Sequence, residues 1–306
     1  MDKIVHYLPL AKSIVLLTCL LLYFSVVEQT VAETIHQERS IYRDIMVVQN
    51  GYRRCLVFNV HRGDRNQTCV EVNDRDRLVF SYTRMSFAGL LLQPQPETIL
   101  VAGLGGGSIP MTLNNLFPEA KIDVVEIDQA VVNVAKEYFF FEENDNMKVT
   151  VKDARVFVKR AALSGRKYDY IVLDAFGGDY IPEHLLTREF LGEVKTIMAV
   201  DGVLVANTFS TSRFYDHESV TYQDVFNEFF NFKLPTSGNR IIITQLSSLP
   251  PRGELVTRAQ NAADRLKKYG VPLLEYPARL STRVDWDMSR RVLTDQYSPA
   301  NLLRDN

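Results

Sequence analysis

The residues that could do chemistry begin with a glycine-rich loop that is followed, at a set distance, by a carboxylate. Gly103-Leu104-Gly105-Gly106-Gly107-Ser108 comes directly after an apolar run, and glycines at such a turn let the backbone approach a ligand closely. Glu126 ends the next apolar run, 23 residues after Gly103. A carboxylate about 20 residues beyond such a loop is placed to bind ribose hydroxyls. Together they predict a nucleotide-binding site.

Two further runs also end in carboxylates. Asp153 precedes Ala154 after the run KVTVK, where it can accept a hydrogen bond from an adenine amino group or cap a helix. Asp174 opens the stretch DAFGGDY, in which Asp179 is the second carboxylate. Carboxylates and glycines after a buried strand form an anionic rim, which suits an amine or a sulfonium and repels an anion.

Strands and helices must alternate to bring these residues together. From Thr98 on, apolar runs alternate with stretches that carry apolar residues at helical spacing. Runs that are apolar throughout are buried on both faces, so we predict a doubly wound α/β fold with a mostly parallel sheet. The strands are expected at 98–105, 122–128, 148–154, 168–176, 202–209 and 240–246, and the helices at 131–139, 184–198 and 218–230. Ligands of such folds bind at the carboxyl ends of the strands.

A small β-rich unit precedes this fold. Short β-branched runs at 43–50, 53–60, 68–74 and 77–83 alternate with Asn, Gly and Asp clusters, and a short helix is expected at 85–92. The pair Pro94 and Pro96 is taken as the junction. The predicted divisions are therefore a small β-rich domain at 33–96, a nucleotide-binding α/β domain at 97–250, and a C-terminal helix and tail at 251–306.

The first 32 residues do not belong to the predicted fold. Ser13 to Val27 is uncharged, Lys3 and Lys12 precede it, and small residues follow. This is the pattern of a signal peptide or of a membrane anchor, so the protein is expected to be exported to the periplasm or anchored to the inner membrane. Cys55 and Cys69 flank a turn cluster and could face each other across a hairpin, either as a disulfide or as two small buried residues.

Composition excludes several classes of protein. The 306 residues are 46% hydrophobic and 24% charged, as in an ordinary folded protein. Thirty-five basic residues against 37 acidic ones leave a net charge of −2, so no nucleic-acid partner is expected. Three cysteines and five scattered histidines show no metal-ligand spacing, so no metal is expected.

From Thr98 to Gln245 the sequence resembles the polyamine aminopropyltransferases, the spermidine and spermine synthases. The matching motifs, in order, are GLGGGS, VEID, KDA, LDAF, YIPEHLLTREF and LPTSG followed by RIII. The β-rich unit before residue 92 resembles the small N-terminal domain of these enzymes. The tail LTDQYSPANLL is similar to that of bacterial, membrane-associated spermidine-synthase-like proteins.

The resemblance implies a fold of the class I adenosylmethionine-dependent transferase type and a role for each matching residue. Glu126 would bind the ribose hydroxyls of decarboxylated S-adenosylmethionine, and Asp153 with Ala154 its adenine. Gly103 to Gly107 would line the methionine-derived part, and Asp174 would be the catalytic base for a polyamine substrate. The residues expected to bind the amine are Gln67, Tyr82, Asp179 and Tyr215. A homodimer is expected by analogy alone.

Two departures from the family pattern leave the reaction open. Ser108 takes the place of an aspartate that recognises the donor's aminopropyl amine, and Asp179 lies farther from Asp174 than the family's second aspartate does. Aminopropyl transfer is the first hypothesis. The alternatives are an S-adenosylmethionine-dependent methyltransferase, which Ser108 suits, and a non-catalytic binder of polyamines or nucleosides.

Overall fold

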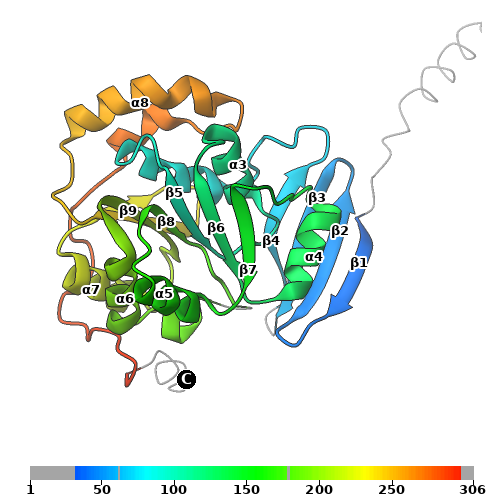
Figure 1. The fold of residues 1–306 in the computed structure, drawn as a ribbon, viewed down its shortest axis with the longest axis horizontal. Coiled ribbons are helices and arrows are strands. Elements are labelled where there is room, and N and C mark those ends of the chain that lie inside the picture. The colour runs from blue at the N-terminus through cyan, green and yellow to red at the C-terminus, as the bar shows by residue number, and fades with distance from the viewer. Residues whose placement is uncertain (1–31, 61–62, 178–179, 298–306) are drawn as a thin grey trace, which may run out of the picture.

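Two β-sheets and a set of flanking helices make up the chain (Figure 1). The computed structural model describes residues 32–60, 63–177 and 180–297, and for residues 59, 60 and 63–65 it describes the backbone alone. Nearly all of the predicted signal or anchor segment, and Asp179, thus lie outside the described residues. Within the described ranges, no helix is long and apolar enough to cross a bilayer.

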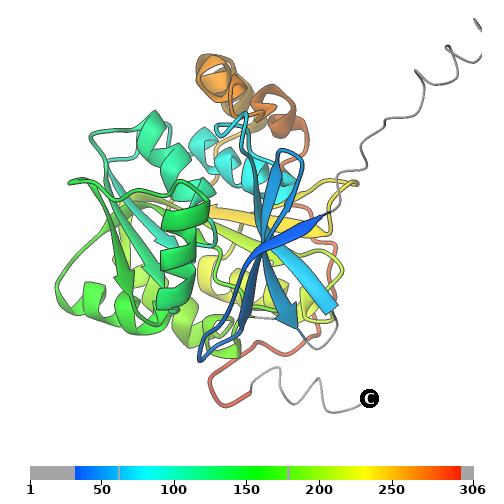
Figure 2. The same cartoon turned by 90° about the vertical axis from the view of Figure 1, so that its right-hand side faces the viewer.

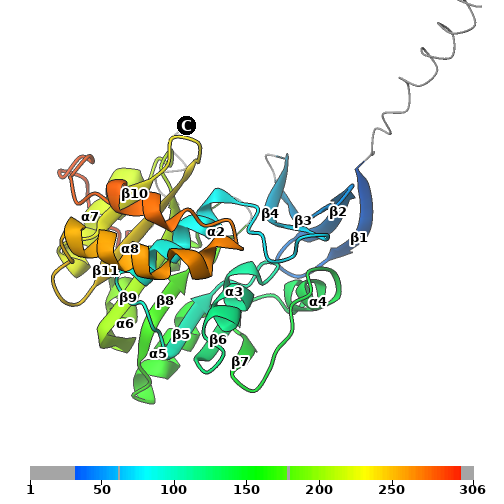
Figure 3. The ribbon, with the colours of Figure 1, turned by 90° about the horizontal axis from the view of Figure 1, so that it is seen from above.

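The N-terminal sheet is antiparallel, with each strand paired to the next along the chain. Its strands are β1 (Glu33–Arg39), β2 (Asp44–Asn50), β3 (Arg53–Val60) and β4 (Gly63–Glu71). Alternation in β2 and β3 buries Ile45, Leu56 and Phe58 on one face. That face packs on Val131 and Val134 of helix α4 (Gln129–Tyr138), which lies along β2 in Figures 1 and 3. In Figure 2 the same sheet faces the viewer in front of the rest of the chain.

A disulfide joins β3 to β4. Cys55 and Cys69 are direct cross-strand partners, and their sulfurs are bonded. The disulfide alternative of the sequence analysis is thereby confirmed.

Removal of this disulfide is expected to lower the free energy of unfolding. The bond closes a loop across a sequence separation of 14, and a loop of about 15 residues contributes about 3 kcal/mol in the chain-entropy account. We expect Cys55→Ser/Cys69→Ser to unfold at a lower urea concentration than the oxidised wild type. A reductant should lower the wild-type midpoint and leave that of the double variant unchanged. An unchanged midpoint in the variant would contradict the prediction.

The large sheet has seven strands in the order β10-β11-β9-β8-β5-β6-β7. They are β5 (Thr98–Ala102), β6 (Lys121–Glu126), β7 (Met147–Val151), β8 (Tyr168–Leu173), β9 (Met198–Phe209), β10 (Phe230–Lys233) and β11 (Asn239–Gln245). Five strands from β7 to β9 are parallel, and β11 and β10 are antiparallel at one edge. The predicted doubly wound, mostly parallel sheet is confirmed.

Helices cover both faces of this sheet. One face carries α3 (Ser108–Leu116), α8 (Arg252–Lys267) and the chain from Leu78 to Leu92, including α2 (Ser81–Ser86). The other face carries α5 (Ala154–Leu163), α6 (Arg188–Ile197) and α7 (Tyr215–Phe226). Figure 1 shows α8 on the opposite side of the sheet from α5, α6 and α7. The chain runs from β5 outward to β7 and then returns to β8, so β5 and β8 border the point where ligands bind in such sheets.

Residues 77–83 do not form the predicted strand. A helix starts at Ser81, and the Arg84 guanidinium donates hydrogen bonds to the carbonyls of Leu78 and Val79. The Leu78 N–H donates to the Tyr269 carbonyl. These hydrogen bonds, two from a nearby arginine and one to distant Tyr269, take the place of a strand ladder, and they depend on residues that the local β-branched pattern does not include.

Candidate active site

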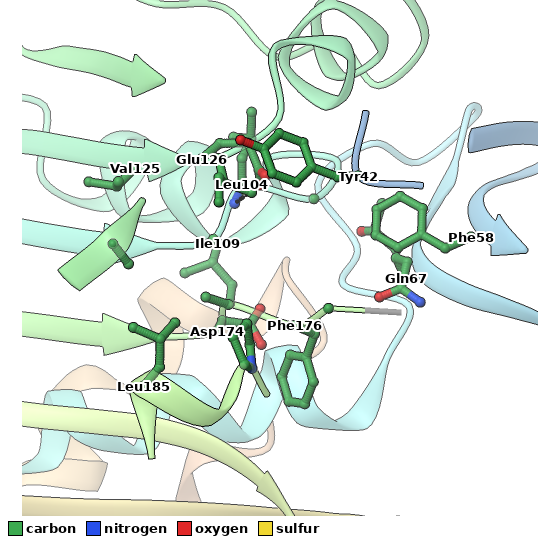
Figure 4. Close-up of a pocket in the computed structure, with 18 of the residues that line it drawn as sticks. Tyr42, Phe58, Gln67, Leu104, Ile109, Val125, Glu126, Asp174, Phe176 and Leu185 are labelled. Carbon is green, nitrogen blue, oxygen red and sulfur yellow. Dashed lines mark hydrogen bonds between the residues drawn. The ribbon is translucent and has the colours of Figure 1, made fainter. Parts of the chain in front are cut away.

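A cavity of about 280 Å³ lies at the carboxyl ends of the parallel strands, between the large sheet and the N-terminal sheet. Glu126 ends β6, Asp174 comes directly after β8, and Asp153 lies two residues after the end of β7. Figure 4 shows Glu126 and Asp174 on the strand side of the cavity, with Phe58 and Gln67 of the N-terminal sheet across from them. The predicted edge of the sheet therefore does bring these carboxylates together.

Three glycines of the loop, Gly103, Gly106 and Gly107, lie where a Cβ atom would collide with a neighbouring residue. Gly103 has φ +101°, and a Cβ there would lie 2.3 Å from the carbonyl oxygen of Asp174. A Cβ on Gly106 would lie 2.4 Å from the Cγ2 of Thr68 in β4. Gly103 and Gly105 line the cavity, as does the side chain of Leu104 between them. Gly106 and Gly107, which were also expected to bind the cofactor, do not line it; a Cβ on Gly107 would lie 2.5 Å from the ring of Phe141. The loop therefore presents the backbone of Gly103 and Gly105 and the Leu104 side chain to a ligand.

Glu126 is buried and held in place by the backbone. Its Oε2 accepts from the Leu104 N–H at 3.1 Å, and its Oε1 accepts from the Asp128 N–H at 3.1 Å. Burial raises the pKa of Glu126, while the Arg43 charge and the two N–H donors partly offset that rise. A carboxylate that lines a cavity while buried can accept from ligand hydroxyls at its remaining lone pairs.

Asp153 has two partners at the adjoining end of the cavity. It caps α5 by accepting from the Val156 N–H at 3.0 Å, and its other oxygen lies 2.8 Å from Nε2 of His184. Ala154 lies beside it in the cavity wall. The sequence analysis did not single out His184 as a partner, because 31 residues separate it from Asp153.

The loop between β1 and β2 lies at the end of the cavity that holds Glu126. Tyr42 and Arg43 both line it. Arg43 lies 3.6 Å from Asp128, donates to the Phe176 carbonyl at 3.3 Å and stacks 4.5 Å from the ring centroid of Phe58. This arginine ties the N-terminal sheet to the loops after β6 and β8. The sequence analysis did not identify Arg43 as a site residue, because an arginine in a hairpin loop is ordinarily expected to be exposed to solvent.

Asp174 lies in the middle of the cavity wall with one oxygen engaged. Its Oδ1 accepts from Nδ2 of Asn207 at 2.8 Å. Burial raises the pKa of Asp174 to about 7, and the Asn207 hydrogen bond acts in the opposite direction. A carboxylate that titrates near neutrality is suited to accept and release a proton at physiological pH.

Tyr82 and Gln67 bridge α2 to β4 beside Asp174. The Tyr82 hydroxyl donates to the backbone carbonyl of Gln67 at 2.9 Å. Burial and the nearby Asp174 carboxylate hold the pKa of Tyr82 well above its ordinary value. Both residues, which the resemblance implied as amine-binding, line the same cavity as Asp174.

Ser108 begins α3 at another part of the wall. Its Oγ lies 3.3 Å from Oγ1 of Thr68, and Thr68 is buried. Both hydroxyls line the cavity. This part of the cavity therefore offers neutral hydroxyls at a helix N-terminus.

A second cavity, of about 360 Å³, adjoins the first. The two share Gln67, Tyr82, Phe176 and Gly177. Among the described residues, the second cavity is lined by aromatic rings, amides and hydroxyls, with Phe80, Phe209, Asn66, Asn207, Asn239, Ser81, Thr236, Ser237 and Gly238 completing the wall. Asp174 lines the first cavity and its partner Asn207 lines the second, so the predicted base lies at their junction.

Tyr215 lies away from both cavities. Its hydroxyl donates to Asp285 at 2.6 Å and accepts from Lys233 at 2.9 Å, while the Arg240 guanidinium lies 4.1 Å from its ring centroid. These contacts use the tyrosine for packing at the start of α7, so the predicted amine contact is wrong. Glu218, one turn along α7, is buried in an ion pair with Arg240 at 2.9 Å.

Among the described residues, no group of three or more His, Cys, Asp and Glu side chains is arranged to hold a metal ion. The carboxylates of the cavity instead have protein partners: N–H groups for Glu126, His184 for Asp153 and Asn207 for Asp174. Such partners leave lone pairs for organic ligands with hydroxyl or amino groups.

Comparison with known proteins agrees with this geometry. A family model described as "Spermine/spermidine synthase domain" matches residues 79–242, just over half of the chain. The chain is 50% identical, over 298 residues, to a polyamine aminopropyltransferase of Vibrio vulnificus (strain CMCP6), and the alignment covers 97% of this chain and 99% of that protein.

Solved structures share the fold. A probable spermidine synthase from Corynebacterium glutamicum ATCC 13032 superposes with a TM-score of 0.63 at 20% identity, over 86% of this chain and 99% of that one. Human methyltransferase-like protein 13, solved in complex with SAH, gives a TM-score of 0.56 at 27% identity, over 69% of this chain and 96% of that one. On the family match and the full-length relative, the chain belongs to the spermine/spermidine synthase family.

Proposed function

We propose that the protein transfers an aminopropyl group from decarboxylated S-adenosylmethionine to an amine of a polyamine. The observation that carries the proposal is the place of Asp174, a single carboxylate with a near-neutral pKa where two cavities meet. The first cavity would hold the donor and the second the acceptor. The name of the Vibrio vulnificus relative supports this assignment.

The residues of the first cavity fit an adenosyl donor. Glu126 is a buried carboxylate with open lone pairs, as ribose hydroxyls require, and Gly103 and Gly105 let the backbone approach the sulfonium part closely. Asp153 and Ala154 would contact the adenine, with His184 setting the orientation of the Asp153 carboxylate. Tyr42 and Arg43 would cover the nucleotide from the N-terminal sheet.

Asp174 would supply general-base catalysis. An aliphatic amine has a pKa near 10 and is mostly protonated at neutral pH, so it cannot attack until a base removes a proton. Asp174 would accept that proton while the amine nitrogen forms a bond to the propyl carbon next to the sulfonium. The carbon–sulfur bond breaks, its electrons neutralise the sulfur, and methylthioadenosine leaves. Gln67 and Tyr82 would align the amine for this displacement.

The reaction rate is expected to fall when the pH is lowered below the pKa of Asp174. The ionised carboxylate is the reactive form, and burial raises the pKa of Asp174 to about 7. In a plot of log(kcat/KM) for the acceptor against pH, we therefore expect the slope to increase by one below about pH 7, so that the rate falls faster as the pH is lowered. The measurement is the initial rate from pH 5.5 to 9. A profile without such a break would contradict the assigned base.

Product analysis tests the proposal. The full chain would be incubated with decarboxylated S-adenosylmethionine and a mixture of diamines and polyamines, and the products identified by mass spectrometry. We expect methylthioadenosine together with an amine longer by one aminopropyl unit, and neither product from Asp174→Asn. Absence of both products from the wild type would overturn the proposal.

Methyl transfer is the second candidate, favoured by one feature of the site. Thr68 and Ser108 place hydroxyls at the N-terminus of α3, an environment that tolerates the carboxylate of intact S-adenosylmethionine. In the same assay, intact S-adenosylmethionine would then give S-adenosylhomocysteine and a methylated product. The likeness to human methyltransferase-like protein 13, which is 27% identical and was solved in complex with SAH, also supports this candidate.

We also propose that the folded part of the chain lies in an oxidising compartment. The Cys55–Cys69 disulfide supports this, since such bonds persist outside the reducing cytoplasm. The apolar segment within residues 1–32 would direct export or anchor the chain. Alkylation of fractionated cells with a thiol reagent tests this: the two cysteines should resist labelling until a reductant is added.

A further inference from the structure

Two asparagines connect the acceptor cavity to Asp174. Nδ2 of Asn239 donates to Oδ1 of Asn207 at 3.0 Å, and Nδ2 of Asn207 donates to Oδ1 of Asp174 at 2.8 Å. Asn207 lies near the end of β9 and is only 3% exposed, and Asn239 begins β11. The three side chains come from different strand ends, and both asparagines line the second cavity.

The hydrogen bonds determine which way each amide points. An asparagine amide has one accepting oxygen and one donating nitrogen. Because Asn239 donates to the Asn207 oxygen, the Asn207 nitrogen must face Asp174. A flipped Asn207 would set its oxygen against the carboxylate and leave two acceptors facing each other, which is unfavourable in a buried site.

The loop that carries Asn239 is itself tied to β9. The Ser210 N–H and hydroxyl both donate to the Gly238 carbonyl, at 2.8 and 3.0 Å. The Asn239 N–H donates to Oγ of Ser237 at 3.2 Å. Asn239 is therefore held against Asn207 by backbone contacts, and an acceptor that enters the second cavity meets both amides.

We propose that Asn239 and Asn207 form an amide relay that positions Asp174 as the base of the transfer. Asn207 binds one carboxylate oxygen, which leaves the other free to take the proton of the acceptor, and Asn239 keeps Asn207 in the donating orientation. Both are positioning residues, and the inference rests on the proposed function. No side chain of the relay other than Asp174 changes protonation.

The other groups around Asp174 show why the hydrogen bond from Asn207 controls its ionisation. Tyr82 faces Asp174 from α2, and its phenol is neutral at the pH of interest because its pKa is raised. The charged or titratable side chains farther along the first cavity are Tyr42, Arg43, Glu126, Lys152, Asp153 and His184. Against burial, the hydrogen bond from Asn207 is the contact that stabilises the ionised form of Asp174.

The test combines three variants with two readouts. Asn207→Leu keeps the volume and removes the donor, so we expect kcat to fall by roughly 10- to 100-fold and the acid break of the pH profile to move up by about one unit. Asn207→Asp puts a second carboxylate beside Asp174 and should move the break farther. Asn239→Ala should lower kcat by a smaller factor and add nothing in the Asn207→Leu background.

The second readout is the titration of the Asp174 carboxyl by carbon-13 NMR in the resting protein, assigned with Asp174→Asn. The titration midpoint of this carboxyl should move to higher pH in Asn207→Leu. The matched control is Asn231→Leu, which changes an asparagine of β10 that is 4% exposed and outside both cavities. This control should lower stability without moving the titration. Binding of methylthioadenosine should stay within about twofold in every variant, because the relay does not line the donor's nucleotide end.

The outcomes separate the relay from the function. If Asn207→Leu loses activity while the titration and the acid break stay in place, Asn207 is structural only and the relay is wrong. If the effects of Asn239→Ala and Asn207→Leu add in full, the two do not act in series. If the wild type transfers no group but the Asp174 titration still moves in Asn207→Leu, the proposed function fails and the positioning role stands.

Discussion

Asp174→Asn is expected to abolish product formation while leaving the protein folded and able to bind the donor. The amide cannot accept the proton of the acceptor amine, and a positioned base contributes about 10²- to 10⁴-fold to such a rate. The change keeps the shape of the side chain, and Asn207 can still bond the remaining carbonyl oxygen. The measurement is kcat with saturating donor and amine, compared with the wild type at the same pH.

Stability provides the control for this variant. The folded pKa of Asp174 is about 7, above the ordinary value of 3.8 for an aspartate, so the folded state holds the proton more tightly than the unfolded state does. This residue therefore favours folding at acid pH, and that contribution is lost as the pH rises toward 7. At pH 8 the neutral amide avoids burial of a charge, so Asp174→Asn should melt at or above the wild-type temperature. A variant that melts well below the wild type at pH 8 would contradict this stability prediction, and a folded variant that keeps wild-type kcat would contradict the catalytic assignment.

Glu126→Ala is expected to weaken donor binding by roughly 100-fold, since a hydrogen bond to a charged group contributes about 1.5–3 kcal/mol. The variant loses the acceptors for the ribose and leaves the buried N–H groups of Leu104 and Asp128 without a partner. The measurement is the Kd for methylthioadenosine by calorimetry. We expect the KM for the donor to rise by a similar factor and the KM for the amine to change little.

Asp123→Ala is a suitable control for Glu126→Ala. Asp123 also lies on β6, but it bonds Arg166 and Tyr168 outside the cavity. Its removal should lower stability without changing the Kd. If the Kd stays unchanged in Glu126→Ala, or rises equally in both variants, Glu126 does not contact the donor.

Much of the fold could be predicted because its signals are local. Apolar runs with short loops place Glu126, Asp153 and Asp174 after successive strands, and parallel strands present their carboxyl ends at one edge. The glycine loop is recognisable for a similar reason, since four glycines follow an apolar run directly, and at Gly103 a Cβ would collide with the Asp174 carbonyl. Strands β1 and β10 were missed: β1 is mostly polar, and β10 is only four residues long.

The sequence by itself determined the class of fold, the line of carboxylates and the family resemblance, because each depends on residue type and spacing along the chain. Only the tertiary structure decided how the site is completed. Arg43 and Thr68 reach it from the N-terminal sheet, Asn207 and Asn239 engage Asp174, and Tyr215 is taken by Asp285. These pairings join side chains 32 or more residues apart, so they depend on how sheets and loops pack together, which periodicity along the chain does not encode.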